Sequence, residues 1–316
     1  MTQKKTATIS FANYLVNTKE DLHRALDTLI KQVDWSAFEI LLSPIHNKIF
    51  GRKSYPAVLM FKCLLLQNWY NLSNYELERV IDDRLSFRRF VGLDYTQSVP
   101  DHSSFSRFRD ELVKRQLDAP LFNELSQQIE KRGLVIRQGT LIDASILQAD
   151  VEKPKPKSDG KGGISKNDPD ASWTKKRGKA YFGYKIHVGV DQGSGIIRKQ
   201  AFTSARVHDT NLFNSLISKD EDFVYADKGY ASRKNDHFLK RQGIKNGILF
   251  KKENRSAIYQ RFNYHVSKIR SRVETVFGVF KKHYGYRRVR YRSLIKNALQ
   301  FSLLCICYNL RKICAN

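Results

Sequence analysis

The sequence YHVSKIRSRVETVFGVFKKH spans Tyr264 to His283. Its apolar residues recur at steps of three and four, which is the period of a helix that buries one face. These residues are Val266, Ile269, Val273, Val276 and Phe280. At about 100° per residue, Arg270, Glu274 and Lys281 fall on a second stripe beside the apolar one. We therefore expect one long helix with a buried face and a charged face next to it.

Basic residues outnumber acidic ones on this helix. Glu274 is its only acid, and the bases around it are Lys268, Arg270, Arg272, Lys281 and Lys282. One carboxylate does not neutralise so many cations, so the excess predicts an anionic partner. The alternative is an ordinary amphipathic helix whose basic face is exposed to solvent.

The whole chain is basic as well. Its 316 residues suffice for roughly two domains, and 56 Lys and Arg against 31 Asp and Glu give a net charge of +25. Between residues 251 and 296, fourteen Lys or Arg face only Glu253 and Glu274, a local net charge of +12. Such a balance predicts binding to a polyanion, because neutralised phosphates release counterions whatever the base sequence.

Membrane and secretion signals are not apparent in the sequence. No apolar run approaches the ~18 residues of a transmembrane helix, and the first residues lack the apolar core of a signal peptide. Four cysteines form no C-x-x-C pair, which is typical of a reducing compartment. We expect a cytoplasmic, nucleoid-associated protein without a membrane partner.

Residues 1–132 read as an all-helical domain. Ser73 and Glu76 match a capping box only a few residues after a preceding apolar run, so a tight helix-turn-helix is expected there. Arginines follow at positions 79, 84, 88 and 89. This spacing permits a DNA-reading element, and the domain is predicted to bind DNA ends. A plain helical hairpin within a bundle has the same pattern.

Residues 133–316 change to a mixed pattern. Short strands are expected at 141–147 and 223–226, and a hairpin is expected from 184–190 and 196–202 around a Gly-containing turn. With the long helix that follows, they predict an α/β domain. The fold class is therefore α+β, with a helical domain followed by a mixed α/β domain.

A basic insertion separates the first strand from the hairpin. Residues 152–180 contain nine Lys or Arg, three prolines and four glycines, with few large apolar side chains. Such a segment does not fold alone, so we expect a flexible loop that is either functional or a plain insertion.

A second basic segment follows the long helix. Arg287, Arg288 and Arg290 alternate there with tyrosines, a pattern suited to phosphate contact and base stacking. The alternative is a solvent-exposed connector.

Three acids occupy positions where a charge is costly. Asp143 interrupts a buried strand, Asp227 ends another, and Glu274 borders the apolar face of the long helix. If they converge, their mutual repulsion requires bound cations. Oxygen ligands with few histidines suit Mg²⁺ or Mn²⁺. Two such ions about 4 Å apart would clamp an in-line phosphoryl displacement.

These residues resemble a known family. The strand-borne Asp143, the run DKGY at 227–230 and the R-x3-E-x6-K spacing at 270–281 are similar to the DDE transposases of bacterial insertion sequences, in particular insertion sequence family five. The run DHSSFSRFR at 101–109 resembles the helical domain of that family. The resemblance covers almost the whole chain.

The resemblance implies a ribonuclease-H-like core in which Asp143, Asp227 and Glu274 are catalytic and bind two divalent ions. It also implies cleavage at terminal inverted repeats of double-stranded DNA, joining of the freed 3′ hydroxyl to target DNA, and a homo-oligomer, a dimer, in the synaptic complex. Arg270 and Lys281 take the basic positions near the cut. Lys282 and the three arginines at 287, 288 and 290 are further DNA-binding candidates.

The family pattern also marks secondary positions. Ser267 stands where the family usually has Tyr, and Tyr264 lies one turn earlier. Lys228 and Tyr230 follow Asp227 and are possible accessory residues. Asp209 is a further acid near a strand end, either an accessory residue or a helix N-cap.

Three other functions suit a basic chain with these acids. A tyrosine recombinase requires a His-x-x-Arg constellation, and no histidine here is followed by Arg at that spacing. A ribonuclease-H-like nuclease without strand transfer and a catalytically dead DNA-binding regulator both remain open. The chain contains no Gly-x4-Gly-Lys-[Ser/Thr] phosphate loop, so no nucleotide cofactor is expected.

Overall fold

The computed structural model describes residues 24–46, 54–155, 163–176, 178–250 and 256–315. The chain divides into two compact units, one of residues 1–129 with 302–316 and the other of residues 130–301. The first division falls near the predicted boundary after residue 132. The last residues, predicted to end the α/β domain, count instead with the helical unit.

The first unit is helical, as predicted. Its elements are α2 (Arg24–Gln32), α3 (Trp35–Leu42), η1 (Ser43–His46), α4 (Ala57–Trp69), α5 (Asn74–Asp83), α6 (Leu85–Val91), α7 (His102–Lys114), α8 (Asp118–Lys131) and the later part of α12 (Leu294–Ala315). The predicted capping box is present at α5, where Ser73 and Glu76 each accept the other's backbone N–H. Asp101 caps α7 with its carboxylate, which accepts from the Ser104 amide.

Two of the four arginines in the predicted DNA-reading region serve the fold of this unit. Arg88 is buried and donates to Asp82 Oδ1 and to four backbone carbonyl oxygens. Arg89 pairs with Asp27 at 2.7 Å. Because their guanidinium groups are held inside the unit, Arg88 and Arg89 do not supply the exposed cations that a DNA-reading helix needs.

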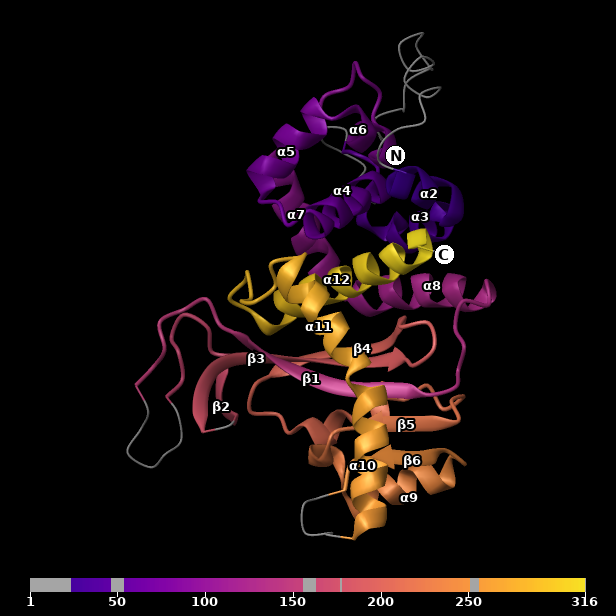
Figure 1. The fold of residues 1–316 in the computed structure, drawn as a ribbon. Coiled ribbons are helices and arrows are strands. Elements are labelled where there is room, and N and C mark those ends of the chain that lie inside the picture. The colour runs from indigo at the N-terminus through magenta and orange to yellow at the C-terminus, as the bar shows by residue number, and fades with distance from the viewer. Residues whose placement is uncertain (1–23, 47–53, 156–162, 177, 251–255, 316) are drawn as a thin grey trace. The chain divides into compact units, whose positions relative to one another are not determined.

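The second unit is a mixed α/β domain built on one sheet (Figure 1). Its elements are β1 (Thr140–Gln148), β2 (Ser172–Lys176), β3 (Lys179–Asp191), β4 (Ile197–Ser204), η2 (Asp209–Leu212), η3 (Asn214–Leu216), β5 (Phe223–Ala226), η4 (Lys228–Tyr230), α9 (Arg233–Arg241), β6 (Lys245–Ile248), α10 (Ala257–Arg270), α11 (Arg272–Lys282) and the start of α12. The predicted strands and hairpin are confirmed.

The sheet order is β2-β3-β1-β5-β6, with β4 also paired to β3. β1 pairs antiparallel with β3 and parallel with β5, so it occupies the centre. The β3–β4 hairpin is closed by the buried Asp191, whose carboxylate accepts from the amide and hydroxyl of Ser194. Alternation along β1 places Leu141 and Asp143 on one face of the sheet and Ile142 on the other.

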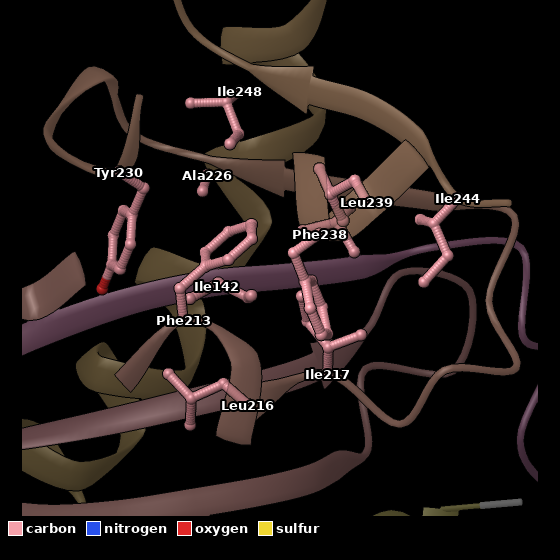
Figure 2. Packing of buried hydrophobic residues seen from close by; sticks show 11 residues of the cluster. Ile142, Phe213, Leu216, Ile217, Ala226, Tyr230, Phe238, Leu239, Ile244 and Ile248 are labelled. Atoms are coloured by element: carbon pink, nitrogen blue, oxygen red, sulfur yellow. The ribbon is translucent and has the colours of Figure 1, made fainter. Parts of the chain in front are cut away.

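The face carrying Ile142 packs against α9 and the short η turns. Figure 2 shows Ile142, Phe213, Leu216, Phe238 and other side chains of this cluster meeting around one centre. Several are completely buried, and each such side chain contributes about 1.5–3 kcal/mol relative to an exposed one. The apolar residues of β1 and β5 thereby fix the register that also positions the acids.

The opposite face carries the predicted long helix, but in two parts. α10 ends at Arg270 and α11 begins at Arg272, with Ser271 between them. The Ser271 hydroxyl donates to the Lys268 carbonyl oxygen at 2.8 Å, a back-bond that often bends helices. The apolar stripe is nonetheless buried as predicted along α11, at Val273, Val276 and Phe280.

The basic insertion is more ordered than the sequence predicts. Within it, Ser172–Lys176 forms β2, which pairs antiparallel with the first residues of β3. The fully buried Asp168 accepts a hydrogen bond from Tyr184 Oη at 2.5 Å. The predicted flexible loop differs from the structure because composition does not show which strand the segment can pair with. That strand is β3. Residues 156–162 of the insertion lie outside the described part of the chain.

In the described part of the chain, no helix is long and apolar enough to cross a membrane.

Candidate active site

Two aspartates lie side by side on the central strands. In the parallel pairing of β1 with β5, Ile142 stands opposite Ala226, so the next residues, Asp143 and Asp227, are neighbours. Alternation places both on the face that carries α10 and α11. The Asp227 carboxylate accepts from the Lys228 amide at 2.8 Å and caps the turn η4.

Arg270 is the direct counterion of Asp143. Its Nη1 donates to Asp143 Oδ2 at 2.9 Å, and the two side chains are only 17% and 20% exposed. Burial raises the pKa of the Asp143 carboxyl, and Asp227 raises it further. The Ala144 amide, Arg270 and Lys176 act in the opposite direction. Asp143 is therefore a half-buried acid whose charge depends on nearby cations.

Glu274 reaches the same guanidinium from the next helix. It lies in the first turn of α11, and its Oε1 is 3.8 Å from Arg270 Nη2. Its side chain is 67% exposed. Arg270 thus links Glu274 to Asp143. Across the residues that the structure describes, no group of three or more His, Cys, Asp or Glu side chains is close enough together to hold a metal ion.

The basic candidates follow the helix. Lys281 and Lys282 lie in the last turn of α11, and Arg287, Arg288 and Arg290 are exposed in the segment after it. Arg288 pairs with Asp150 at 3.4 Å.

Lys281 lies in the electrostatic neighbourhood of Asp143. Burial lowers the pKa of the Lys281 ammonium, followed by the nearby charges of Lys176 and Arg287, while Asp143 acts in the opposite direction. Lys176 is not among the residues predicted from the sequence, because it lies in the segment expected to be a flexible loop. The alternation around Trp173 was the signal that could have revealed the strand.

Two of the accessory candidates, Asp209 and Tyr230, lie on the side of the sheet that carries Ile142. Asp209 pairs with Lys185 at 2.9 Å, and the register places Lys185 on the face opposite Asp143. Lys228 is exposed. Tyr230 is 2% exposed, and its Oη has no hydrogen-bond partner among the described residues.

Tyr230 lies among the acids of both sides. Its phenol pKa is raised by burial and then by the charges of Asp209, Asp143 and Asp227. The phenol therefore remains protonated and is a buried hydrogen-bond donor near the carboxylates.

Two family models match the chain. One, described as "Transposase DDE domain", matches residues 136–310, and another, described as "Transposase domain (DUF772)", matches residues 13–111. The solved structure of the piggyBac transposase synaptic complex with hairpin DNA is similar with a TM-score of 0.50 at 11% sequence identity. That likeness covers 94% of this chain and 75% of the other.

The structural likeness concerns the fold, and it confirms the predicted ribonuclease-H-like α/β unit after a helical region. The first family model spans more than half of the chain and includes all three acids described above. The chain therefore belongs to the family of transposases with a DDE domain.

Proposed function

We propose that this transposase cleaves DNA at the terminal inverted repeats of its insertion sequence and joins the freed 3′ hydroxyl ends to target DNA. The observation that carries the proposal is the adjacency of Asp143 and Asp227, with Glu274 linked to Asp143 through Arg270. The resemblance of the R-x3-E-x6-K spacing supports a bacterial element of insertion sequence family five.

The donor set fits divalent cations in its chemistry. Asp143 and Asp227 repel each other on one face of the sheet, and oxygen donors of this kind suit Mg²⁺ or Mn²⁺. We infer that Asp143, Asp227 and Glu274 together hold two such ions. When bound, the ions supply stabilisation of the attacking and leaving oxygens in a phosphoryl displacement.

The remaining residues act on charge and position. Without bound DNA and metal ions, Arg270 neutralises Asp143 and also lies close to Glu274. When the two carboxylates bind metal ions instead, the Arg270 guanidinium is released to bind a DNA phosphate. Lys281, Lys282 and the exposed arginines after α11 bind the flanking phosphates. The helical domain, residues 1–132, binds the DNA ends.

The proposed DNA partner and oligomer follow from the charge of the chain and from its similarity to a solved transposase structure. A net charge of +25 favours double-stranded DNA as the partner. The similar solved structure is titled a synaptic complex with hairpin DNA. We extend that assembly to this protein as a homodimer that brings two DNA ends together, in the cytoplasm at the nucleoid.

The test is cleavage and joining of a labelled duplex that carries the element's own end, with Mg²⁺ and then with a chelator. Native protein should leave a 3′ hydroxyl and join it to a second DNA. Asp227→Asn and Glu274→Gln should abolish both steps while duplex binding remains. Asp222→Asn is the matched control, because Asp222 is exposed and lies just before β5, the strand that Asp227 follows. This variant should retain both steps.

Other results separate the alternatives. Cleavage without joining would favour a nuclease. Binding without cleavage in either Mg²⁺ or Mn²⁺ would favour a DNA-binding regulator or a dead copy. Full activity of Asp227→Asn would contradict the assignment of the site.

A further inference from the structure

Lys281 interacts electrostatically with two cations from distant parts of the sequence, Lys176 and Arg287, and both Lys176 and Lys281 also interact with Asp143. Lys176 is the last residue of β2, Lys281 lies in the last turn of α11, and Arg287 follows that helix. Among the residues that the structure describes, none of these three cations forms an ion pair. The acid whose charge acts on Lys281 is Asp143.

The backbone explains how Arg287 reaches Lys281. After α11 the chain turns back at Gly285, which has φ of 62°, and the Tyr286 amide donates to the Phe280 carbonyl oxygen at 2.8 Å. This hydrogen bond returns the chain to the end of the helix. Arg287, which follows Tyr286, is thereby placed close to Lys281, which follows Phe280.

The sheet brings β2 to the same end of the unit. The Val289 amide donates to the Gln148 carbonyl oxygen at 3.1 Å, at the end of β1. Gln148 pairs with Gly183 of β3, and Gly183 pairs in turn with Ser172 of β2. The segment carrying Arg287 and the first residue of β2 therefore both lie near the end of β1, and Lys176 follows four residues further along β2.

The three charges repel one another in this arrangement. Lys281 is half-buried, and both Lys176 and Arg287 favour its neutral form. Asp143 offsets this only in part, because its carboxylate is already held by Arg270. A cluster of cations whose one nearby acid is already paired with another residue binds an added anion favourably.

We propose that Lys176, Lys281 and Arg287 together bind one phosphate group of the DNA strand that enters beside Asp143. The inference rests on the proposed function for the identity of the anion. It gives the basic insertion a defined role, because β2 contributes Lys176 to the site. The phosphate would be held next to the carboxylates, which positions the neighbouring linkage for reaction.

Alternation along β2 supplies a matched control. Lys175 and Lys176 are adjacent, equally charged and both exposed, but successive residues of a strand point to opposite faces. Lys175→Gln and Lys176→Gln remove the same charge from the same strand. A general effect of net charge would appear in both variants, and a phosphate site only in the second.

The experiment measures binding of the labelled terminal duplex at several salt concentrations, with a chelator present so that no cleavage occurs. Lys176→Gln should weaken binding, and Lys175→Gln should not. The triple variant Lys176→Gln/Lys281→Gln/Arg287→Gln should lower the slope of log K against log[salt] by about 1, since the three cations share one phosphate. Circular dichroism checks that each variant is folded.

A second measurement locates the phosphate. Single uncharged methylphosphonate linkages are placed in turn along the duplex. One position should weaken binding by the native protein and by Lys175→Gln, with no further loss for the triple variant. Equal losses in Lys175→Gln and Lys176→Gln, or a slope lowered by about 3 in the triple variant, would overturn the shared site.

The outcome is separable from that of the proposed function. A protein that shows the shared phosphate but never cleaves DNA would support the site and contradict the function. A protein that cleaves and joins DNA while Lys176→Gln binds with native affinity and salt slope would support the function and overturn the site.

Discussion

Arg270 is the residue on which the charges of the site depend. It pairs with Asp143 at 2.9 Å and lies 3.8 Å from Glu274, so one guanidinium serves two carboxylates. Because the Asp143 and Arg270 side chains are largely shielded from water, removal of one leaves the other with an unpaired charge in a poorly hydrated place.

We predict that Arg270→Gln lowers the free energy of unfolding by about 1–3 kcal/mol at neutral pH. Adding Asp143→Asn to that variant should recover most of the loss, because the unpaired carboxylate is then gone. Urea unfolding with a chelator measures both variants and the single Asp143→Asn change. Losses that simply add in the double variant would show that the two side chains do not interact.

At the scale of elements, the long strand β3 joins the sheet centre to the β2 hairpin. Its first residues pair with β2, and its later residues pair with β1 and β4. Gly183 lies where the pairing of β3 passes from β2 to β1, and it has φ of 153°. A Cβ there would overlap the Leu147 carbonyl oxygen and lie 2.6 Å from the Ala149 amide nitrogen. This close approach requires glycine.

We predict that Gly183→Ala lowers the free energy of unfolding by about 2–4 kcal/mol, from backbone strain and the clash with β1. Gly178→Ala is the control. Gly178 also has a positive φ, of 78°, but a Cβ there would meet nothing within 4 Å. It should cost only about 1 kcal/mol. Equal losses in chemical denaturation would mean that the contact with β1 is not what constrains Gly183.

At the scale of the whole molecule, a basic chain still encloses ion pairs that stabilise its α/β unit. Arg198 is 4% exposed in its side chain and donates to both Asp220 oxygens, at 2.6 and 2.7 Å, and to Glu130 at 3.1 Å. Arg137 also pairs with Asp220 at 3.1 Å. The hydrogen bonds from Arg198 are the main cause of a lowered Asp220 pKa.

This ion-pair network predicts acid sensitivity. A lowered carboxyl pKa means that the stability from Asp220 is present above its unfolded value of about 3.9 and is lost as pH falls through the folded value. Arg198→Met should lower the free energy of unfolding by about 1–3 kcal/mol at neutral pH, since Asp220 is partly solvated. The difference from native protein should shrink below about pH 4.

Urea unfolding at neutral and acidic pH tests this prediction. Arg206→Met is the control, because Arg206 is exposed just after β4 and should have little effect at either pH. A difference between native and Arg198→Met protein that stays constant down to low pH would show that Asp220 is not the group concerned.

Much of the fold was predictable, because short-range patterns encode it. The capping box at Ser73, the hairpin of β3 and β4 and the strand that ends before Asp227 each depend on a few consecutive residues. The long helix was predicted from its apolar period, but the break at Ser271 was not. A side-chain hydrogen bond from Ser271 to the Lys268 carbonyl oxygen accompanies that break, and such a bond leaves the apolar period unchanged.

By itself the sequence determined the positions of the three acids, the basic residues spaced around Glu274, and the strands and helices with a clear local pattern, because these follow from residue type and spacing. Only the tertiary structure decided that Arg270 holds Asp143, that Lys176 comes to Lys281, and that Ser302–Asn316 counts with the helical unit. Arg270 and Asp143 are 127 residues apart. Contacts at such separations are set by sheet register and packing between elements, which no local pattern specifies.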